Sequence, residues 1–182
     1  MSTKATYKDA TRKKVVRKFL FSFFNEKNIV GLAGPDIKEY ISWCKENGID
    51  NIELWENDTN VMFDQLSKIP KNAKVSYNFG DIINAESSKD KVYDFDYCTT
   101  IVTLHDHIKR FKNEKFVMTF CTRKVGNKVT IDEFFYGRRE KITSMVEKSS
   151  PIHHWSIKTV FGNYIVAPYF DTTPMLCIAK IS

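Results

Sequence analysis

The stretch Asn28–Asp58 decides the fold, and it reads NIVGLAGPDIKEYISWCKENGIDNIELWEND. A short apolar strand, expected over Ile29–Leu32, breaks at the turn pair Gly34-Pro35. Beyond this turn, apolar side chains recur with the i, i+3, i+4, i+7 spacing that marks one face of a helix. These side chains are Ile37, Tyr40, Ile41 and Cys44. The pattern predicts a strand, a tight turn and an amphipathic helix.

The same stretch continues into a second strand that ends on an acid. Asn47-Gly48 ends the helix, as a C-terminal turn pair does, and a strand over Asn51–Trp55 is followed by Glu56. A strand, a turn, a helix and a second strand with a terminal carboxylate form the first half of a nucleotide-binding α/β unit. The N–H groups at the helix N-terminus can bind an anionic ligand, and Glu56 can bind the two hydroxyls of a ribose.

Strands and helices continue to alternate along the chain before a β-rich tail. Further strands are expected over residues 74–78, 92–95, 116–121, 155–160, 164–167 and 175–181. Helices are expected over residues 15–24, 60–69 and 100–111, and from Ile131 through Val146. Phe161-Gly162-Asn163 predicts the turn of a hairpin. The pattern therefore predicts an α/β fold with a mostly parallel sheet and an antiparallel end.

Length and composition predict one α/β domain behind a basic N-terminal segment. The chain has 182 residues and a formal net charge of +6. We expect residues 1–27 to form a basic arm or helix and residues 28–182 to form a single domain. The sequence has neither a long apolar run nor a signal-peptide pattern, and its four cysteines are scattered, so we expect a cytoplasmic protein. Frequent Lys, Asn, Ile and Phe suggest an AT-rich genome, such as that of a phage or virus.

Cations crowd the first eighteen residues, where a single acid, Asp9, opposes them. Such a cluster suits a polyanion, because basic arms reach the phosphate backbone of nucleic acids. The alternative is a solvated helix face that keeps the protein soluble. The candidate nucleic-acid-binding residues are Arg12, Lys13, Lys14, Arg17 and Lys18.

Three acids follow three consecutive predicted strands. They are Glu56 after the second strand, Asp81 after the third and Asp96 after the fourth. The carboxyl ends of parallel strands meet at one edge of a sheet, where ligands of open α/β folds bind. Each acid taken singly could instead cap a helix or a turn. The three together predict a ligand-binding crevice.

This order of elements, from about residue 28 to 181, resembles the class I S-adenosylmethionine-dependent methyltransferases. Gly34-Pro35 is similar to the Gly-Pro of that family's cofactor loop. The chain departs from the family at Val30, where an acid is usual, and at Leu32 and Asp36, where glycines are usual. The resemblance implies a Rossmann-like sheet of about seven strands, with helices on both faces and an antiparallel C-terminal hairpin. It implies S-adenosylmethionine as the cofactor.

The resemblance also implies a role for each site residue. The ribose would be held by Glu56, the adenine edge by Asp81 and the methionine part by Gly31 and Gly34. Asp96 and Tyr97 lie where that family places its acceptor-binding or catalytic motif, similar to Asp/Asn-Pro-Pro-Tyr without the prolines. Asp96 could accept hydrogen bonds from an exocyclic amine, and Tyr97 could stack on a base or simply pack in the core. The implied activity is methyl transfer, with nucleic acid as the expected substrate.

Several alternatives remain open on the sequence. The chain could be a catalytically inactive methyltransferase-like subunit that binds nucleic acid or serves in assembly, or an α/β enzyme that uses another nucleotide. A protein partner could supply specificity, since no target-recognition domain is evident. Cys98 could be a nucleophile, although an inert thiol is the simpler interpretation. His105 and His107 would lie on different faces of a helix, so we expect no metal site.

Overall fold

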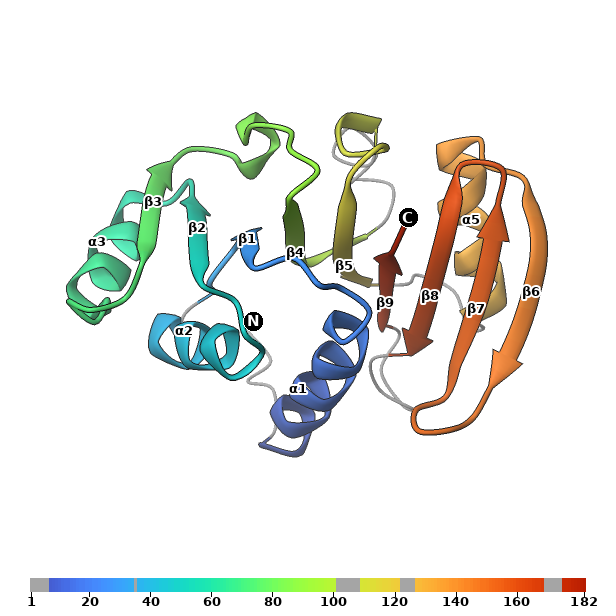
Figure 1. The fold of residues 1–182 in the computed structure, drawn as a ribbon, viewed down its shortest axis with the longest axis horizontal. Coiled ribbons are helices and arrows are strands. Elements are labelled where there is room, and N and C mark those ends of the chain that lie inside the picture. The colour runs from blue at the N-terminus through green and yellow to red at the C-terminus, as the bar shows by residue number, and fades with distance from the viewer. Residues whose placement is uncertain (1–6, 35, 101–108, 122–126, 169–174) are drawn as a thin grey trace.

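The computed structural model describes residues 7–34, 36–100, 109–121, 127–168 and 175–182. Its strands form one nine-stranded sheet (Figure 1). The strands are β1 (Asn28–Gly31), β2 (Asn51–Glu56), β3 (Val75–Phe79), β4 (Lys91–Thr100), β5 (Lys115–Cys121), β6 (Ile142–Lys148), β7 (His154–Thr159), β8 (Gly162–Pro168) and β9 (Met175–Lys180). Their order across the sheet is β3-β2-β1-β4-β5-β9-β8-β7-β6. The first five strands in this order are parallel, and each of the remaining four is antiparallel to its neighbours.

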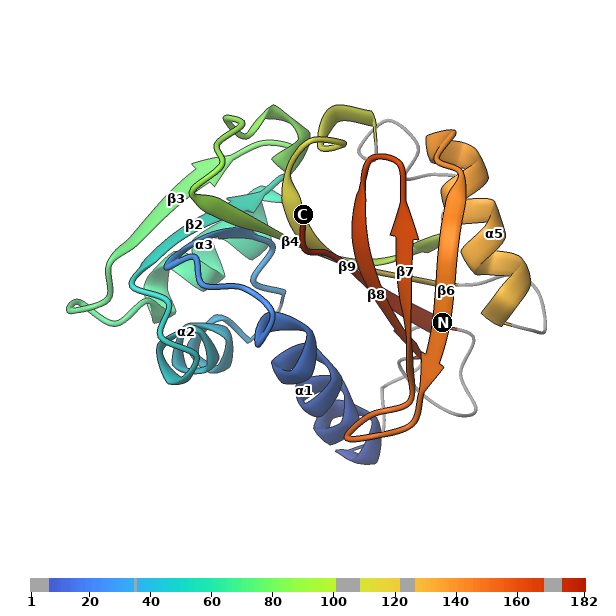
Figure 2. The ribbon, with the colours of Figure 1, turned by 45° about the vertical axis from the view of Figure 1, so that its right-hand side comes forward.

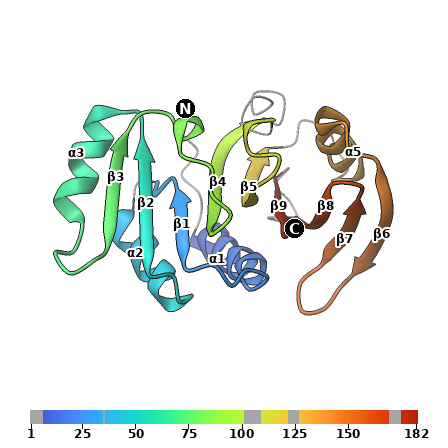
Figure 3. The ribbon, with the colours of Figure 1, turned by 45° about the horizontal axis from the view of Figure 1, so that its top comes forward.

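Helices cover both faces of this sheet. They are α1 (Tyr7–Phe21), α2 (Ile37–Glu46), α3 (Thr59–Lys68), the 3₁₀ helix η1 (Ile82–Asn84) and α5 (Asn127–Arg138). One core cluster joins α1 and α2 to the sheet, and a second joins α5 to the opposite face. Figure 2 shows α1 and α5 on opposite sides of β6–β8, and Figure 3 shows α3 beside β3 at the sheet edge. Within the described ranges, no helix has the length and apolar content that a bilayer-spanning segment requires.

The predicted helix after the Gly34-Pro35 turn is confirmed, with its boundaries set by local chemistry. The Asp36 carboxylate accepts a hydrogen bond from the Glu39 backbone N–H at 3.1 Å and caps the N-terminus of α2. The four apolar residues of the predicted face are all buried. At the other end, the left-handed conformation of Gly48, with φ of 73°, turns the chain toward β2.

The α/β class and the antiparallel C-terminal strands are confirmed, but the sheet is larger than predicted. The expected helix from Ile131 through Val146 is wrong in its second half, because α5 ends at Arg138 and β6 begins at Ile142. Arg139 adopts the left-handed conformation, with φ of 59°. Its N–H donates to the Tyr136 carbonyl, and the next N–H, of Glu140, donates to the Phe135 carbonyl. Such a pair of hydrogen bonds ends many helices, usually with a glycine in the left-handed position. In this chain the residue in that position is Arg139.

Two other boundaries differ from the expectation. Strand β4 runs on to Thr100, where a helix was expected to begin, and residues 101–108 of that helix lie outside the described part of the chain. Helix α1 begins at Tyr7 instead of Val15. Its buried residues Val16 and Leu20 belong to the core, so helix α1 packs on the sheet.

Candidate functional site

A pocket of about 350 Å³ lies at the carboxyl ends of β1 to β4. It brings together five of the residues predicted from the sequence, namely Gly34, Glu56, Asp81, Asp96 and Tyr97. Leu32, Asn57, Gly80 and Ile82 complete its lining. The three acids predicted to meet at one sheet edge therefore do line one cavity.

Glu56 forms the end of β2 and is held by its own loop. Its Oε1 accepts hydrogen bonds from the backbone N–H groups of Asn57 and Asp58, both at 2.9 Å. Asp58, not Glu56, caps α3, because its carboxylate accepts from the first N–H groups of that helix. The described residues supply no hydrogen bond to the other carboxylate oxygen, Oε2 of Glu56. Glu56 thus presents an oriented carboxylate to the pocket, as binding of a diol requires.

Asp81 and Tyr97 line the same pocket from adjoining elements. Asp81 caps η1 by accepting a hydrogen bond from the Ile83 N–H at 3.0 Å. The preceding Gly80, with φ of 136°, provides the turn that places it there. Burial raises the pKa of the Tyr97 phenol, and the nearby charge of Asp81 raises it further, so Tyr97 is a neutral hydroxyl at neutral pH. Its ring lies parallel to that of Phe95, with 6.0 Å between the centroids.

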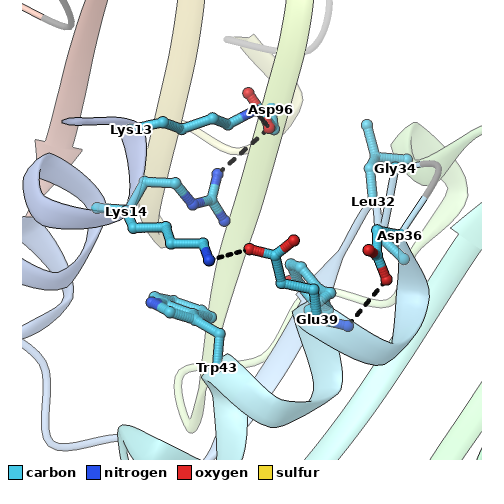
Figure 4. A pocket seen from close by; sticks show the side chains of 11 residues that line it. Lys13, Lys14, Leu32, Gly34, Asp36, Glu39, Trp43 and Asp96 are labelled. Carbon is cyan, nitrogen blue, oxygen red and sulfur yellow. Dashed lines mark hydrogen bonds and ion pairs between the residues drawn. The ribbon is translucent and has the colours of Figure 1, made fainter. Parts of the chain in front are cut away.

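A second pocket, of about 310 Å³, opens between α1 and α2 and shares Leu32, Gly34 and Asp96 with the first. Figure 4 shows its lining, in which charged side chains of α1 face those of α2 and β4. The cations are Lys13, Lys14 and Arg17, the acids are Asp36, Glu39 and Asp96, and Tyr40 and Trp43 add aromatic surface. Two adjacent cavities, one flanked by acids and one with both signs of charge, can accept a ligand that carries polar groups at both ends.

A buried ion pair joins Asp94 to Arg17, which also lines the second pocket. Arg17 is 6% exposed and Asp94 is fully buried, and the Arg17 guanidinium donates to Asp94 Oδ2. The Tyr40 hydroxyl donates to the same oxygen at 2.8 Å. Burial raises the pKa of Asp94, while the charge of Arg17 opposes that rise. The guanidinium also lies 5.3 Å from the ring centroid of Trp43, so α1, α2 and β4 are joined through one arginine.

Asp96 stands at the junction of the two pockets and is contacted by α1. The Lys13 ammonium donates to Asp96 Oδ2, and Arg17 Nη1 lies 3.6 Å from the same oxygen. Lys14, on the next face of the helix, pairs with Glu39 of α2 instead (Figure 4). The predicted acceptor-binding carboxylate is thus covered by the chain's own cations.

The two glycines assigned to the cofactor occupy different places. Gly34 adopts the left-handed conformation, with φ of 64°, and lines both pockets. Gly31 is buried and lines neither of them. A Cβ at Gly31 would overlap the Tyr40 hydroxyl and come within 3.2 Å of Asp94 Cβ. Gly31 therefore makes room for the contact between Tyr40 and Asp94.

The five basic residues expected at a nucleic-acid surface divide between two sides of α1. Arg17 is buried and Lys13 contacts Asp96, so both point inward. Lys14 and Lys18 are exposed, and Arg12 is partly buried. Residues four apart lie on one helix face, which explains why Lys13 accompanies Arg17 and Lys14 accompanies Lys18.

The sequence reasoning missed the network of Asp94, Arg17 and Tyr40. A signal was present, because Asp94 and Asp96 alternate with aromatic residues and so share one face of β4. Two acids on a strand face that is otherwise buried require cations, and Lys13 and Arg17 supply them. Cys98, His105 and His107, which the sequence reasoning also considered, have side chains outside the described residues.

No protein-family model matches the sequence, and no curated protein matches it. Solved structures do match the fold. A S-adenosylmethionine-dependent methyltransferase from Leishmania major aligns with a TM-score of 0.54 at 11% identity, over 94% of this chain and 72% of that one.

Two further solved structures agree. The N-methyltransferase NodS from Bradyrhizobium japonicum aligns with a TM-score of 0.53 at 8% identity, over 95% of this chain and 94% of that one. The tRNA methyltransferase TrmK from Bacillus subtilis aligns with a TM-score of 0.51 at 10% identity, over 98% of this chain and 67% of that one. The chain therefore has the fold of the class I S-adenosylmethionine-dependent methyltransferases.

Proposed function

We propose that the chain binds S-adenosylmethionine in the two joined pockets and transfers its methyl group to an acceptor at Asp96. The observation that carries this proposal is that Glu56 at the end of β2, Asp81 in the loop after β3 and Asp96 in β4 line one cavity. Glu56 would hold the ribose hydroxyls, and Asp81 would accept from the adenine amino group. S-adenosylmethionine, when bound, supplies an electrophilic methyl group.

The second pocket fits the amino-acid end of that cofactor. An α-ammonium and an α-carboxylate need both signs of charge within a few ångströms, and the pocket between α1 and α2 offers acids and cations together. Asp36 already caps α2, so the helix N-terminus is not the carboxylate's partner. Lys14, with more than half of its side chain exposed, is the better candidate. Gly34 is the glycine that remains at the proposed cofactor site.

Asp96 is the residue best placed to receive the acceptor. Its carboxylate lines both cavities, so an acceptor bound there lies beside the junction of the cofactor's two halves. A carboxylate at this position accepts the N–H groups of an amine and stabilises the positive charge that develops on nitrogen during transfer. Tyr97 can add its hydroxyl or its ring edge beside it.

Nucleic acid is the substrate class that we propose. The exposed cations of α1, Lys14 and Lys18, and the net charge of +6 support contacts with phosphates. One of the matching folds is that of a tRNA methyltransferase, which is consistent with this substrate. The scattered cysteines Cys44 and Cys177, which form no disulfide within the described part of the chain, support action in the cytoplasm. A protein partner could add sequence specificity.

Calorimetric titration with S-adenosylmethionine and S-adenosylhomocysteine tests the proposal. Glu56→Gln keeps an oxygen for the loop N–H groups and removes the charge, so it should weaken binding about tenfold to about a hundredfold. Glu46→Gln, on an exposed position in the last turn of α2, is the matched control and should bind as the unmodified chain does. A folded protein that gives no heat with either ligand would refute cofactor binding.

A second candidate function is supported by the contacts that cover Asp96 and by the capping role of Asp36. The same fold, with a cofactor loop that no longer binds its ligand, would serve as a nucleic-acid-binding or assembly subunit. Saturable binding to an oligonucleotide, together with no binding of S-adenosylmethionine, would favour this function over the first.

A further inference from the structure

The contact between Lys13 and Asp96 places an amino group of the chain inside its own candidate site. Lys13 lines the pocket between α1 and α2, and its ammonium donates to Asp96 Oδ2. Asp96 also lines the neighbouring cavity with Glu56 and Asp81. The carboxylate at the junction of the two pockets is thus bound to a nitrogen donor that comes from the chain.

The two cations near Asp96 are held very differently. Arg17 has 7% of its side chain exposed and is fixed by Asp94 and by the rings of Phe21 and Trp43. Lys13 has 38% of its side chain exposed and reaches Asp96 on a flexible stem. An exposed lysine contact contributes at most about 1 kcal/mol and is readily exchanged, whereas a buried arginine pair is not. Lys13 is the displaceable cation, and Arg17 is the permanent one.

The carboxylate keeps capacity for a further hydrogen bond. Asp96 Oδ1 is buried and has no hydrogen-bond partner among the residues that the structure describes. Buried carboxylate oxygens without partners are rare and call for an explanation. An amino group carries more than one N–H and can donate to both oxygens of a carboxylate. The geometry around Asp96 therefore suits an amino group better than a hydroxyl, which has one hydrogen to donate.

We propose that Asp96 is an amino-group binding site, which Lys13 fills in the ligand-free chain as an intramolecular competitor of the acceptor. The acceptor is then a nitrogen compound with at least one N–H, and it reaches Asp96 only when Lys13 swings away. On displacement, Lys13 moves toward solvent beside the exposed cations of α1, where it can contact an anionic part of the same acceptor. Naming this amino group as a methyl acceptor rests on the proposed function, whereas the binding site itself does not.

The test removes the competitor and supplies amines from outside. Lys13→Ala should bind n-butylammonium or cytidine up to about fivefold more tightly than the unmodified chain, as expected when a competing contact worth at most about 1 kcal/mol is removed. Lys45→Ala is the matched control, because Lys45 is exposed in the last turn of α2, lines neither pocket and should leave amine binding unchanged. Lys13→Ala combined with Asp96→Asn should lose the gain. Tetramethylammonium controls for the positive charge, and uridine controls for the pyrimidine ring, because neither compound carries an amino N–H group.

The two probes distinguish two sources of the amino group. A gain with n-butylammonium alone assigns the site to a flexible alkyl ammonium, and a gain with cytidine alone assigns it to the amino group of a base. Equal binding of both probes by the unmodified chain, Lys45→Ala and Lys13→Ala would overturn the proposal. Titration of the unmodified chain with S-adenosylmethionine is a separate measurement, so loss of the proposed function and loss of the amino-group site are distinguishable.

Chemical labelling gives a second readout if Lys13→Ala does not fold. Asp96→Asn should increase the rate of acetylation of Lys13 several-fold, because the lysine loses its ion pair with that carboxylate. The rate at Lys14 should stay the same and serves as the internal reference. An unchanged ratio of the two rates, measured by peptide mass spectrometry, would show that Asp96 does not hold Lys13 and would refute the proposal.

Discussion

The fully buried carboxylate of Asp94 accepts a hydrogen bond from Arg17, which is the only cation in such contact with it among the residues that the structure describes. Replacing Arg17 by methionine removes that cation. Methionine keeps much of the side-chain volume, so packing against Phe21 and Trp43 changes little. Removing one partner of a buried ion pair costs about 3 to 5 kcal/mol, because the remaining charge is left without compensation. The hydrogen bond from Tyr40 to Asp94 limits the loss, so we expect about 3 kcal/mol in the free energy of unfolding.

Urea denaturation followed by circular dichroism measures this change. Lys13→Met is the matched control, since the same substitution at a partly exposed lysine should cost less than about 1 kcal/mol. Arg17→Met combined with Asp94→Leu removes both charges and should recover most of the loss, as replacement of a buried ion pair by apolar residues often does.

The pH dependence supplies an independent check on the same pair. The pKa of Asp94 in the folded state is raised above its ordinary value, so the folded state holds the proton more tightly than the unfolded state does. The contribution of Asp94 to stability therefore falls as the pH rises through the window between its unfolded and folded pKa values. Without Arg17 the pKa of Asp94 in the folded state rises further. The loss of unfolding free energy caused by Arg17→Met should therefore shrink as the pH is lowered. A cost below about 1 kcal/mol at neutral pH, or one that grows in acid, would refute the reasoning.

Three further predictions test other parts of the structure. Gly31→Ala should lower the free energy of unfolding by about 1 to 3 kcal/mol in urea titrations, and adding Tyr40→Phe should restore part of it, since the overlap is with the Tyr40 hydroxyl. Arg139→Gly should raise the melting temperature by the equivalent of about 1 kcal/mol, because glycine adopts the left-handed conformation without strain; a lower melting temperature would contradict this account of the α5 terminus. Replacing Lys14 and Lys18 together by alanine should reduce the slope of log affinity against log salt for an oligonucleotide by about 1 to 2, and an unchanged slope would remove α1 from the proposed surface.

The sequence predicted the parallel half of the sheet well because its signals are local. The periodicity of the stretch after Gly34 and the turn pair Asn47-Gly48 each act within a few residues, and α2 formed where they indicated. The same locality explains the error at β6. The end of α5 is set by the backbone at Arg139, and the nearest glycine, Gly137, lies two residues before that position inside the helix.

For the candidate site, the sequence alone placed Glu56 and Asp81 at strand ends, since strand ends and turns are local features, whereas Asp96 lies within β4 because that strand runs on to Thr100. Glu56, Asp81 and Asp96 meet in one cavity because parallel strands bring their carboxyl ends to the same edge. Which cations meet those acids was decided only by the tertiary structure. The packing of α1 on the sheet buries Arg17 against Asp94 and lays Lys13 on Asp96, and contacts between residues about eighty positions apart leave no periodic trace in the chain.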